Sequence, residues 1–163
     1  MAATYRIGEG YDVHKLEPGR SLKVGCVNIP APFGALGHSD GDVLAHALCD
    51  AILGALALGD IGAHFPPTDE RWRGADSRRF VEHAVALARA RGAHVVNVDA
   101  TIVLERPKLA LHIEEMRRAL AGLCGCDPGD VSVKAKTAEG LGPIGEGKAI
   151  EARAVVLLAV VPV

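Results

Sequence analysis

The pattern of apolar and polar residues divides the chain into segments with strand-like and helix-like periods. Apolar runs predict strands over residues 5–14, 95–104, 131–136 and 150–161, and a hairpin over residues 22–29 with Gly25 in its middle. The first strand is expected to be broken at Gly8 and Gly10. Residues 95–104 are apolar on both faces over much of their length, which predicts a central strand.

Apolar residues spaced three and four apart predict three helices among these strands. Leu44 and Leu48 lie on the buried stripe of the first helix, and Asp42 adds favourable charge to its first turn. A loop with Pro66-Pro67 precedes the second helix, and a glycine-rich loop over residues 139–147 precedes the last strand. The predicted helix limits are, in chain order, Ser39 or Asp40 to Gly59, Asp76 to Gly92, and Pro107 to Leu123.

Helices that fall among strands predict an α/β (α+β) fold. We expect a mixed four-stranded sheet with helices packed on one face, plus a small N-terminal hairpin. The whole chain, residues 1–163, is assigned to one domain because no linker or repeat divides it. Few elements remain to cover the second face of the sheet, so oligomerisation is expected.

Composition excludes several classes of partner. The chain is 49% hydrophobic but only 4% aromatic, which suits close packing of helices on a sheet. A net charge of −2 gives no electrostatic attraction to nucleic acid or to an anionic membrane. No targeting segment is recognised, and the four cysteines show no C-x-x-C spacing, so reduced thiols and a cytoplasmic location are expected.

Imidazoles and carboxylates gather in two short segments. Asp12 and His14 are two residues apart and therefore leave the same face of an extended strand. Asp42, His46 and Asp50 are four apart, which places them on one side of a helix. Asp12, His14 and His46 would supply three ligands to a divalent metal such as zinc. The fourth position would stay open for water or substrate, as in catalytic sites.

A different interpretation explains the same residues without a metal. A buried salt-bridge cluster, or a capped helix with a solvated acidic face, would also bring histidines and aspartates together. We prefer this alternative for any single residue, whereas the combination favours a metal site.

The glycine-rich loop matches two nucleotide-binding motifs in part. Residues 140–145 read G-x-G-x-x-G, and residues 142–148 resemble a phosphate-binding loop. No helix is expected after either motif, and Ala149 stands where the phosphate-binding loop requires a hydroxyl. We therefore exclude both a dinucleotide fold and a phosphate-binding loop.

The segment from His38 to Ala47, which reads HSDGDVLAHA, resembles the signature of the 2-C-methyl-D-erythritol 2,4-cyclodiphosphate synthase (MECDP synthase) family. The likeness continues in the family's order and covers nearly the whole chain. The matching blocks are residues 10–14, 58–62, 74–78, 97–99, 107–108 and 133–135, followed by Thr137 and Glu139.

The resemblance implies a compact α/β subunit that assembles as a homotrimer. The sheets would face the three-fold axis, and active sites would lie at the subunit interfaces. The substrate would be 4-diphosphocytidyl-2-C-methyl-D-erythritol 2-phosphate, whose 2-phosphate attacks the β-phosphate, closes a cyclic diphosphate and releases CMP. The enzyme would be a phosphorus–oxygen lyase of the non-mevalonate isoprenoid pathway and would need no protein nucleophile.

The resemblance also implies roles for individual residues. Asp12, His14 and His46 match the ligands of one zinc ion per subunit, and Glu139 matches a carboxylate that binds magnesium or manganese with the substrate diphosphate. Asp42 and Asp50 are suited to orient the ligating imidazoles. The matching substrate-binding residues are His38 and Ser39 for the methylerythritol phosphate, Asp60 and Gly62 for its hydroxyl groups, Pro107, Lys108 and Leu109 for cytosine, and Thr137 for the diphosphate.

The chain departs from the family pattern at three places. Lys136 and Ala138 flank Thr137 where hydroxyl residues are common, and Pro67 replaces an acidic residue of the flexible loop. In Glu146-Gly147-Lys148 the usual order of a basic and an acidic residue is exchanged. This loop lines the trimer axis in the family, so we do not predict an isoprenoid diphosphate ligand there.

Two other functions fit part of the same pattern. A zinc-dependent phosphohydrolase of a nucleotide-linked substrate would use the open metal position to activate water. It would need neither the segment 107–108 nor Glu139. A non-catalytic, metal-stabilised trimer would explain the composition and the ligands, but not two phosphate-adjacent segments far apart in the sequence.

Overall fold

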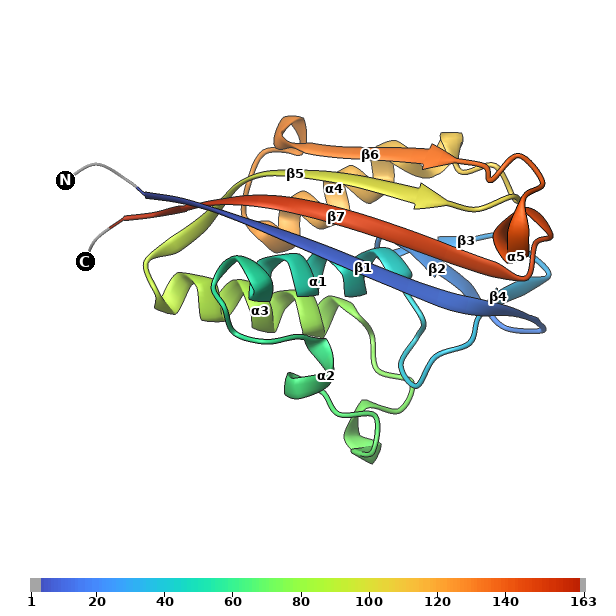
Figure 1. Cartoon of the computed structure of the whole chain (residues 1–163), viewed down its shortest axis with the longest axis horizontal. Coiled ribbons are helices and arrows are strands. Elements are labelled where there is room, and N and C mark those ends of the chain that lie inside the picture. Colours follow the sequence, from blue (N-terminus) through green and yellow to red (C-terminus); the bar gives the residue numbers. More distant parts are fainter. Residues whose placement is uncertain (1–3, 162–163) are drawn as a thin grey trace.

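A five-stranded mixed sheet with three long helices against one face forms the body of the computed structural model, which describes residues 4–161 (Figure 1). The strand order is β4-β1-β7-β5-β6, with β5 and β6 parallel and the other neighbours antiparallel. The strands of this sheet are β1 (Thr4–Pro18), β4 (Phe33–Ala35), β5 (Ala93–Val103), β6 (Val131–Lys136) and β7 (Ala149–Val160). Two further strands, β2 (Leu22–Val24) and β3 (Val27–Ile29), pair separately as a two-stranded antiparallel sheet.

The mixed sheet and the single helical layer agree with the prediction, but the number of strands does not. The prediction of four strands is wrong because β4 pairs with the end of β1, at residues 16–18, which lies beyond the predicted limit of that strand. β4 has three residues, too few to show an alternating pattern. β5 is an inner strand, paired with β7 on one side and β6 on the other, as predicted. It is not apolar on both faces, because the outward side chains of His94, Asn97 and Asp99 are exposed.

β1 continues through Gly8 and Gly10 without interruption, contrary to the predicted break. Helix α1 (Val43–Ala55) crosses β1 at these two glycines. A Cβ atom on Gly8 would lie 1.8 Å from the carbonyl oxygen of Ala51, and one on Gly10 would lie 1.9 Å from that of Ala47. The glycines therefore allow the helix backbone to approach the strand closely.

We expect Gly10→Ala to lower the free energy of unfolding by about 2–3 kcal/mol, because the added methyl group must displace the backbone of α1. Urea unfolding would measure the change. Gly122→Ala is the matched control, since nothing lies within 4 Å of a Cβ at that position in the exposed face of α4. Equal destabilisation of the two variants would contradict the role given to Gly10.

The long helices begin later in the chain than the sequence predicts. Asp42, rather than Ser39 or Asp40, caps α1 and accepts a hydrogen bond from the amide of Ala45 at 3.0 Å. The third predicted helix does not begin at Pro107, which lies in a loop; a 3-10 turn, η2 (Ala110–His112), leads into α4 (Ile113–Cys124). The other helices are α2 (Ile61–His64), α3 (Arg78–Ala90) and α5 (Gly142–Gly145), with the 3-10 turns η1 (Glu70–Trp72) and η3 (Pro128–Asp130).

Three of these short elements lie in segments predicted as loops. α2 and η1 occupy the segment around Pro66-Pro67, and α5 occupies the glycine-rich loop before β7. Each has only three or four residues, so none could show a helical hydrophobic period.

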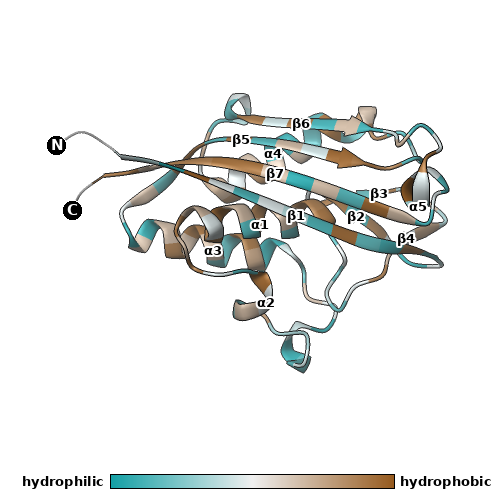
Figure 2. Ribbon diagram, in the orientation of Figure 1, coloured by the Kyte–Doolittle hydropathy of each residue, from teal (hydrophilic) through white to brown (hydrophobic). Residues whose placement is uncertain are grey.

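The core lies between the sheet and α1, α3 and α4 (Figure 1). α1 is hydrophobic along most of its length, and only Asp50 and Gly54 of its 13 residues are not buried. Buried positions recur at every second residue over most of β7, because one face of the sheet meets the helices and the other does not. The C-terminal half of β7 is hydrophobic on both faces (Figure 2). The uncovered face carries large exposed apolar side chains, among them Tyr5, Ile7 and Val13. Among the described residues, no helix has the length and apolar content to cross a membrane.

Candidate metal centre

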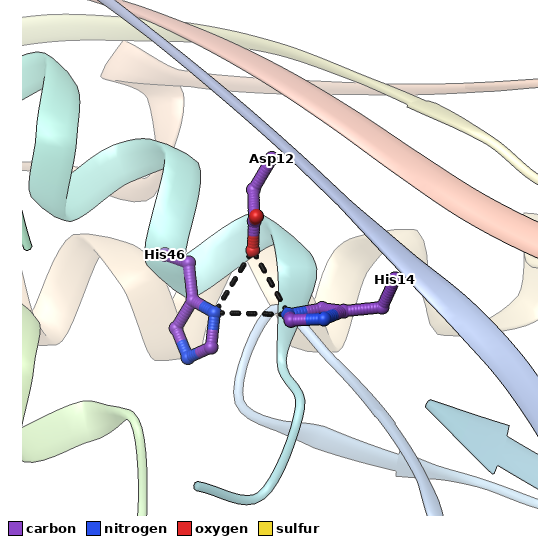
Figure 3. Close-up of side chains that lie close together, drawn as sticks. All are labelled: Asp12, His14 and His46. Carbon is purple, nitrogen blue, oxygen red and sulfur yellow. Dashed lines mark hydrogen bonds and ion pairs between the residues drawn. The ribbon is translucent and has the colours of Figure 1, made fainter. Parts of the chain in front are cut away.

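Two elements bring the predicted ligands together at the start of α1. Asp12 and His14 point from the same face of β1 toward the helix, as their two-residue spacing predicts (Figure 3). His46 lies in the first turn of α1 and points back toward the strand. The close approach of α1 at Gly10 makes this meeting possible, because Gly10 immediately precedes the ligand segment of β1.

The three side chains converge on one point (Figure 3). One carboxylate oxygen of Asp12, Oδ2, lies 2.9 Å from Nε2 of His14 and 2.9 Å from Nδ1 of His46. The two ring nitrogens are 3.1 Å apart. Among residues 4–161, this is the one group of three or more candidate ligands whose ligand atoms all lie within 4.8 Å of one another.

This donor set fits a divalent cation. Ligand atoms about 2.1 Å from a tetrahedral zinc ion lie about 3.4 Å apart, a little more than the separations found here. Two ring nitrogens directed at each other cannot both donate a proton, whereas both can coordinate a cation. Although burial raises the pKa of the Asp12 carboxyl, hydrogen bonds and charge from His14 and His46 hold that pKa well below its usual range. The Asp12 carboxyl group is therefore anionic, as a ligand of a divalent cation would be.

A cavity of about 260 Å³ opens beside the three ligands. His38, Ser39 and Gly62, three of the predicted substrate-binding residues, line it together with the ligands. Phe65, Trp72 and Phe80 add an apolar part to its lining and pack edge-on or tilted against one another. Asp60, also predicted to bind substrate, instead caps α2 by accepting the amide of Ala63 at 2.9 Å.

The remaining predicted substrate residues lie in a second cavity of about 240 Å³. Pro107, Lys108, Leu109 and Thr137 line it, at the ends of β5 and β6. The Thr137 hydroxyl donates to the carboxylate of Glu139 at 2.8 Å. β7 and β5 lie between β1, which carries Asp12 and His14, and β6, so these two strands are about 14 Å apart at the usual strand spacing. The two cavities share no lining residue.

Asp42 and Asp50 do not orient the imidazoles, contrary to the prediction. The buried Asp42 carboxylate accepts the amides of Gly25 at 2.8 Å and Cys26 at 2.6 Å as well as that of Ala45. Asp50 accepts the amide of Ile61 at 2.7 Å. Both carboxylates therefore hold backbone segments from elsewhere in the sequence next to the site.

The hydrogen-bond partners of the His46 ring at Nε2 are two serines for which the sequence predicted no contact with His46. Nε2 of His46 lies 2.8 Å from the hydroxyl oxygen of Ser77 and 3.1 Å from that of Ser39. The sequence signals at Ser77 were its place beside Asp76, at the start of a predicted helix, and its place in the family-matching block 74–78. A pattern of this kind predicts a helix start and does not indicate contact with a metal ligand.

Fold and site together define a class: an α/β protein with a candidate histidine–carboxylate metal site beside a cavity. The chain belongs to the YgbB family, whose family model matches residues 5–159.

Individual members of this family give a more specific comparison. A 2-C-methyl-D-erythritol 2,4-cyclodiphosphate synthase from Verminephrobacter eiseniae is 57% identical over 159 residues, which are 96% of this chain and 87% of the relative. The solved structure of a synthase with the same name, in a form bound to CDP, has a TM-score of 0.87 and 46% identity, and the match covers 94% of this chain and 99% of that one. The bifunctional IspDF protein from Campylobacter jejuni matches 98% of this chain with a TM-score of 0.94 and 36% identity, and the chain spans 43% of that longer protein.

Proposed function

We propose that this protein converts 4-diphosphocytidyl-2-C-methyl-D-erythritol 2-phosphate to 2-C-methyl-D-erythritol 2,4-cyclodiphosphate and CMP. The convergence of Asp12, His14 and His46 beside a cavity is the observation that carries this proposal. Family membership, the names of the relatives and the CDP in a related structure support it. The alternative of a zinc-dependent phosphohydrolase has no support among these relatives.

We assign zinc to Asp12, His14 and His46, and magnesium or manganese to Glu139 together with the substrate diphosphate. Cations bound there would neutralise charge on the diphosphate and on the departing CMP. His38 and Ser39 would bind the methylerythritol phosphate, because both line the cavity next to the ligands. Asp60 and Gly62, at the start of α2, would bind its hydroxyl groups.

The second cavity would hold the nucleotide end of the substrate. Pro107, Lys108 and Leu109 would bind cytosine, and Thr137 would contact the diphosphate. An oxygen of the 2-phosphate then forms a bond to the β-phosphorus while the bond from that phosphorus to the oxygen of CMP breaks. Because both groups belong to one molecule, holding it folded can lower the barrier by about 7–11 kcal/mol.

We propose that the active protein is a homotrimer whose subunits pair the first cavity of one copy with the second cavity of the next. The separation of the cavities within one chain supports this arrangement. The uncovered sheet face offers apolar side chains for the contact, with Ile7 73% and Tyr5 64% exposed. We place the protein in the cytoplasm, where its four free cysteines would stay reduced.

One assay tests the proposed reaction. The protein is incubated with the diphosphocytidyl substrate, zinc and magnesium, and the products are separated by chromatography. We expect CMP and the cyclic diphosphate in equal amounts. CMP with an acyclic product would show a hydrolase, and the absence of turnover would leave only a metal-binding protein.

We expect Glu139→Gln to raise the magnesium concentration needed for half-maximal activity by about tenfold or more, because a neutral amide binds the hard cation less well. Zinc content, measured by mass spectrometry, should stay at the parental value. Glu115→Gln, at an exposed position of α4, is the matched control. It should leave the magnesium requirement and the zinc content unchanged. An unaltered magnesium response in Glu139→Gln would remove this residue from the second metal site.

A further inference from the structure

We propose that Ser77, oriented by Asp40 and Lys23, is a positioning residue that fixes the tautomer of His46 so that Nδ1 is free to bind metal. This inference rests on the metal centre proposed above. The four residues come from β2, the β4–α1 loop, α1 and the start of α3, so they meet only in the folded chain.

The hydrogen bonds run outward from His46 through buried groups. Nδ1 of His46 faces Asp12, and Nε2 lies 2.8 Å from the Ser77 hydroxyl oxygen. Ser77 is 0% exposed and His46 is 8% exposed, so water does not compete for these contacts. The Ser77 hydroxyl in turn donates to Oδ1 of Asp40, and the Ser77 amide donates to Oδ2 of Asp40 at 3.0 Å.

Lys23 fixes the direction of this chain of hydrogen bonds. Its ammonium group lies 2.9 Å from Asp40 and 2.9 Å from Asp76, and its side chain is 15% exposed. Although burial raises the pKa of the Asp40 carboxyl, hydrogen bonds from Ser77 and the charge of Lys23 lower it overall. Asp40 is therefore ionised and can only accept hydrogen bonds.

The proton positions follow from these directions. Because the Ser77 hydroxyl gives its proton to Asp40, the Ser77 oxygen must accept, and Nε2 of His46 must carry the proton that it accepts. Nδ1 of the neutral ring then presents a lone pair toward Asp12, which is itself an acceptor 2.9 Å away. Two acceptors at that distance need a positive charge between them, which a metal ion supplies.

Ser39 does not explain the same tautomer. Its hydroxyl lies farther from Nε2, at 3.1 Å, and can rotate to donate or to accept. Ser77 lacks this freedom because Asp40 takes its proton. Metal-binding histidines commonly depend on such a partner at the second ring nitrogen.

The test measures zinc affinity by competition with a chromophoric chelator in the full-length protein. Ser77→Ala should weaken zinc binding about 10- to 100-fold, the range for loss of an outer partner of a metal ligand. Asp40→Asn should weaken it less, and Ser77→Thr, which keeps the hydroxyl, should restore most of the affinity. Ser21→Ala, at an exposed position, is the matched control and should bind as the parent does.

A second readout separates positioning from a general loss of structure. Long-range ¹H–¹⁵N spectra of the metal-free parent at alkaline pH should show the neutral His46 ring with its proton on Nε2, whereas metal-free Ser77→Ala should mix the two tautomers. Parental zinc affinity in Ser77→Ala, or a proton on Nδ1 in the parent, would overturn the inference. Zinc binding that is unchanged by Asp12→Ala would instead overturn the metal centre itself.

Discussion

His46→Ala is expected to lose bound zinc and to lower kcat/KM by about 1,000-fold, which corresponds to about 4 kcal/mol of transition-state stabilisation. The variant removes one of three converging ligands and leaves Asp12 and His14 as a two-ligand site. Metal content after dialysis and the rate of CMP release would measure both effects.

The same variant should keep its fold and its assembly. His46 packs against Phe80 at a ring-centroid distance of 5.8 Å, so truncation leaves a gap beside the cavity and not within the main core. His94→Ala, on the exposed side of β5, is the matched control and should keep zinc and activity. Full turnover in His46→Ala would show that the ligand assignment is wrong.

Asp42→Ala is expected to lower the free energy of unfolding by about 3–7 kcal/mol. The substitution removes the cap of α1, a loss of about 1 kcal/mol, and leaves two further buried amides unpaired at about 1–3 kcal/mol each. Those amides belong to Gly25 and Cys26, in the turn between β2 and β3. Urea unfolding monitored by the fluorescence of Trp72, the only tryptophan of the chain, would measure the loss.

The matched control removes a similar cap at the surface. Asp127 accepts the amide of Gly129 at 2.7 Å at the start of η3 but is exposed, so water can replace its carboxylate in Asp127→Ala. We expect that variant to lose less than about 1 kcal/mol. Similar losses in the two variants would contradict the bridging role of Asp42 between α1 and the hairpin.

The convergence of Asp12, His14 and His46 could be predicted because the spacing of residues within an element specifies the direction of their side chains. Two residues apart on a strand, Asp12 and His14 must leave the same face, and the helical period places His46 on a defined side of α1. Hydrophobic periods likewise located the long strands and the helices that cover them. Elements of three or four residues, such as β4 and α2, carry no period and were missed.

Local sequence patterns did not predict contacts between residues that are far apart in the sequence. Asp42 and Asp50 have the spacing of groups that could support His46, yet each binds a backbone amide from another segment. Ser77 has the sequence context of a helix start, and its contact with His46 spans 31 residues. Gly8 and Gly10 suggest a broken strand, whereas they accommodate a helix that crosses an unbroken one.

The chain's own periodicity and residue types were therefore enough to specify the fold class and to select Asp12, His14 and His46. Only the tertiary structure decided three other features. These are the close approach of α1 to β1, the contact of His46 with Ser77, and the placement of the two cavities beside different strands. The physical reason is that periodicity sets the direction of a side chain relative to its own element. Which group it meets depends on where the other elements lie.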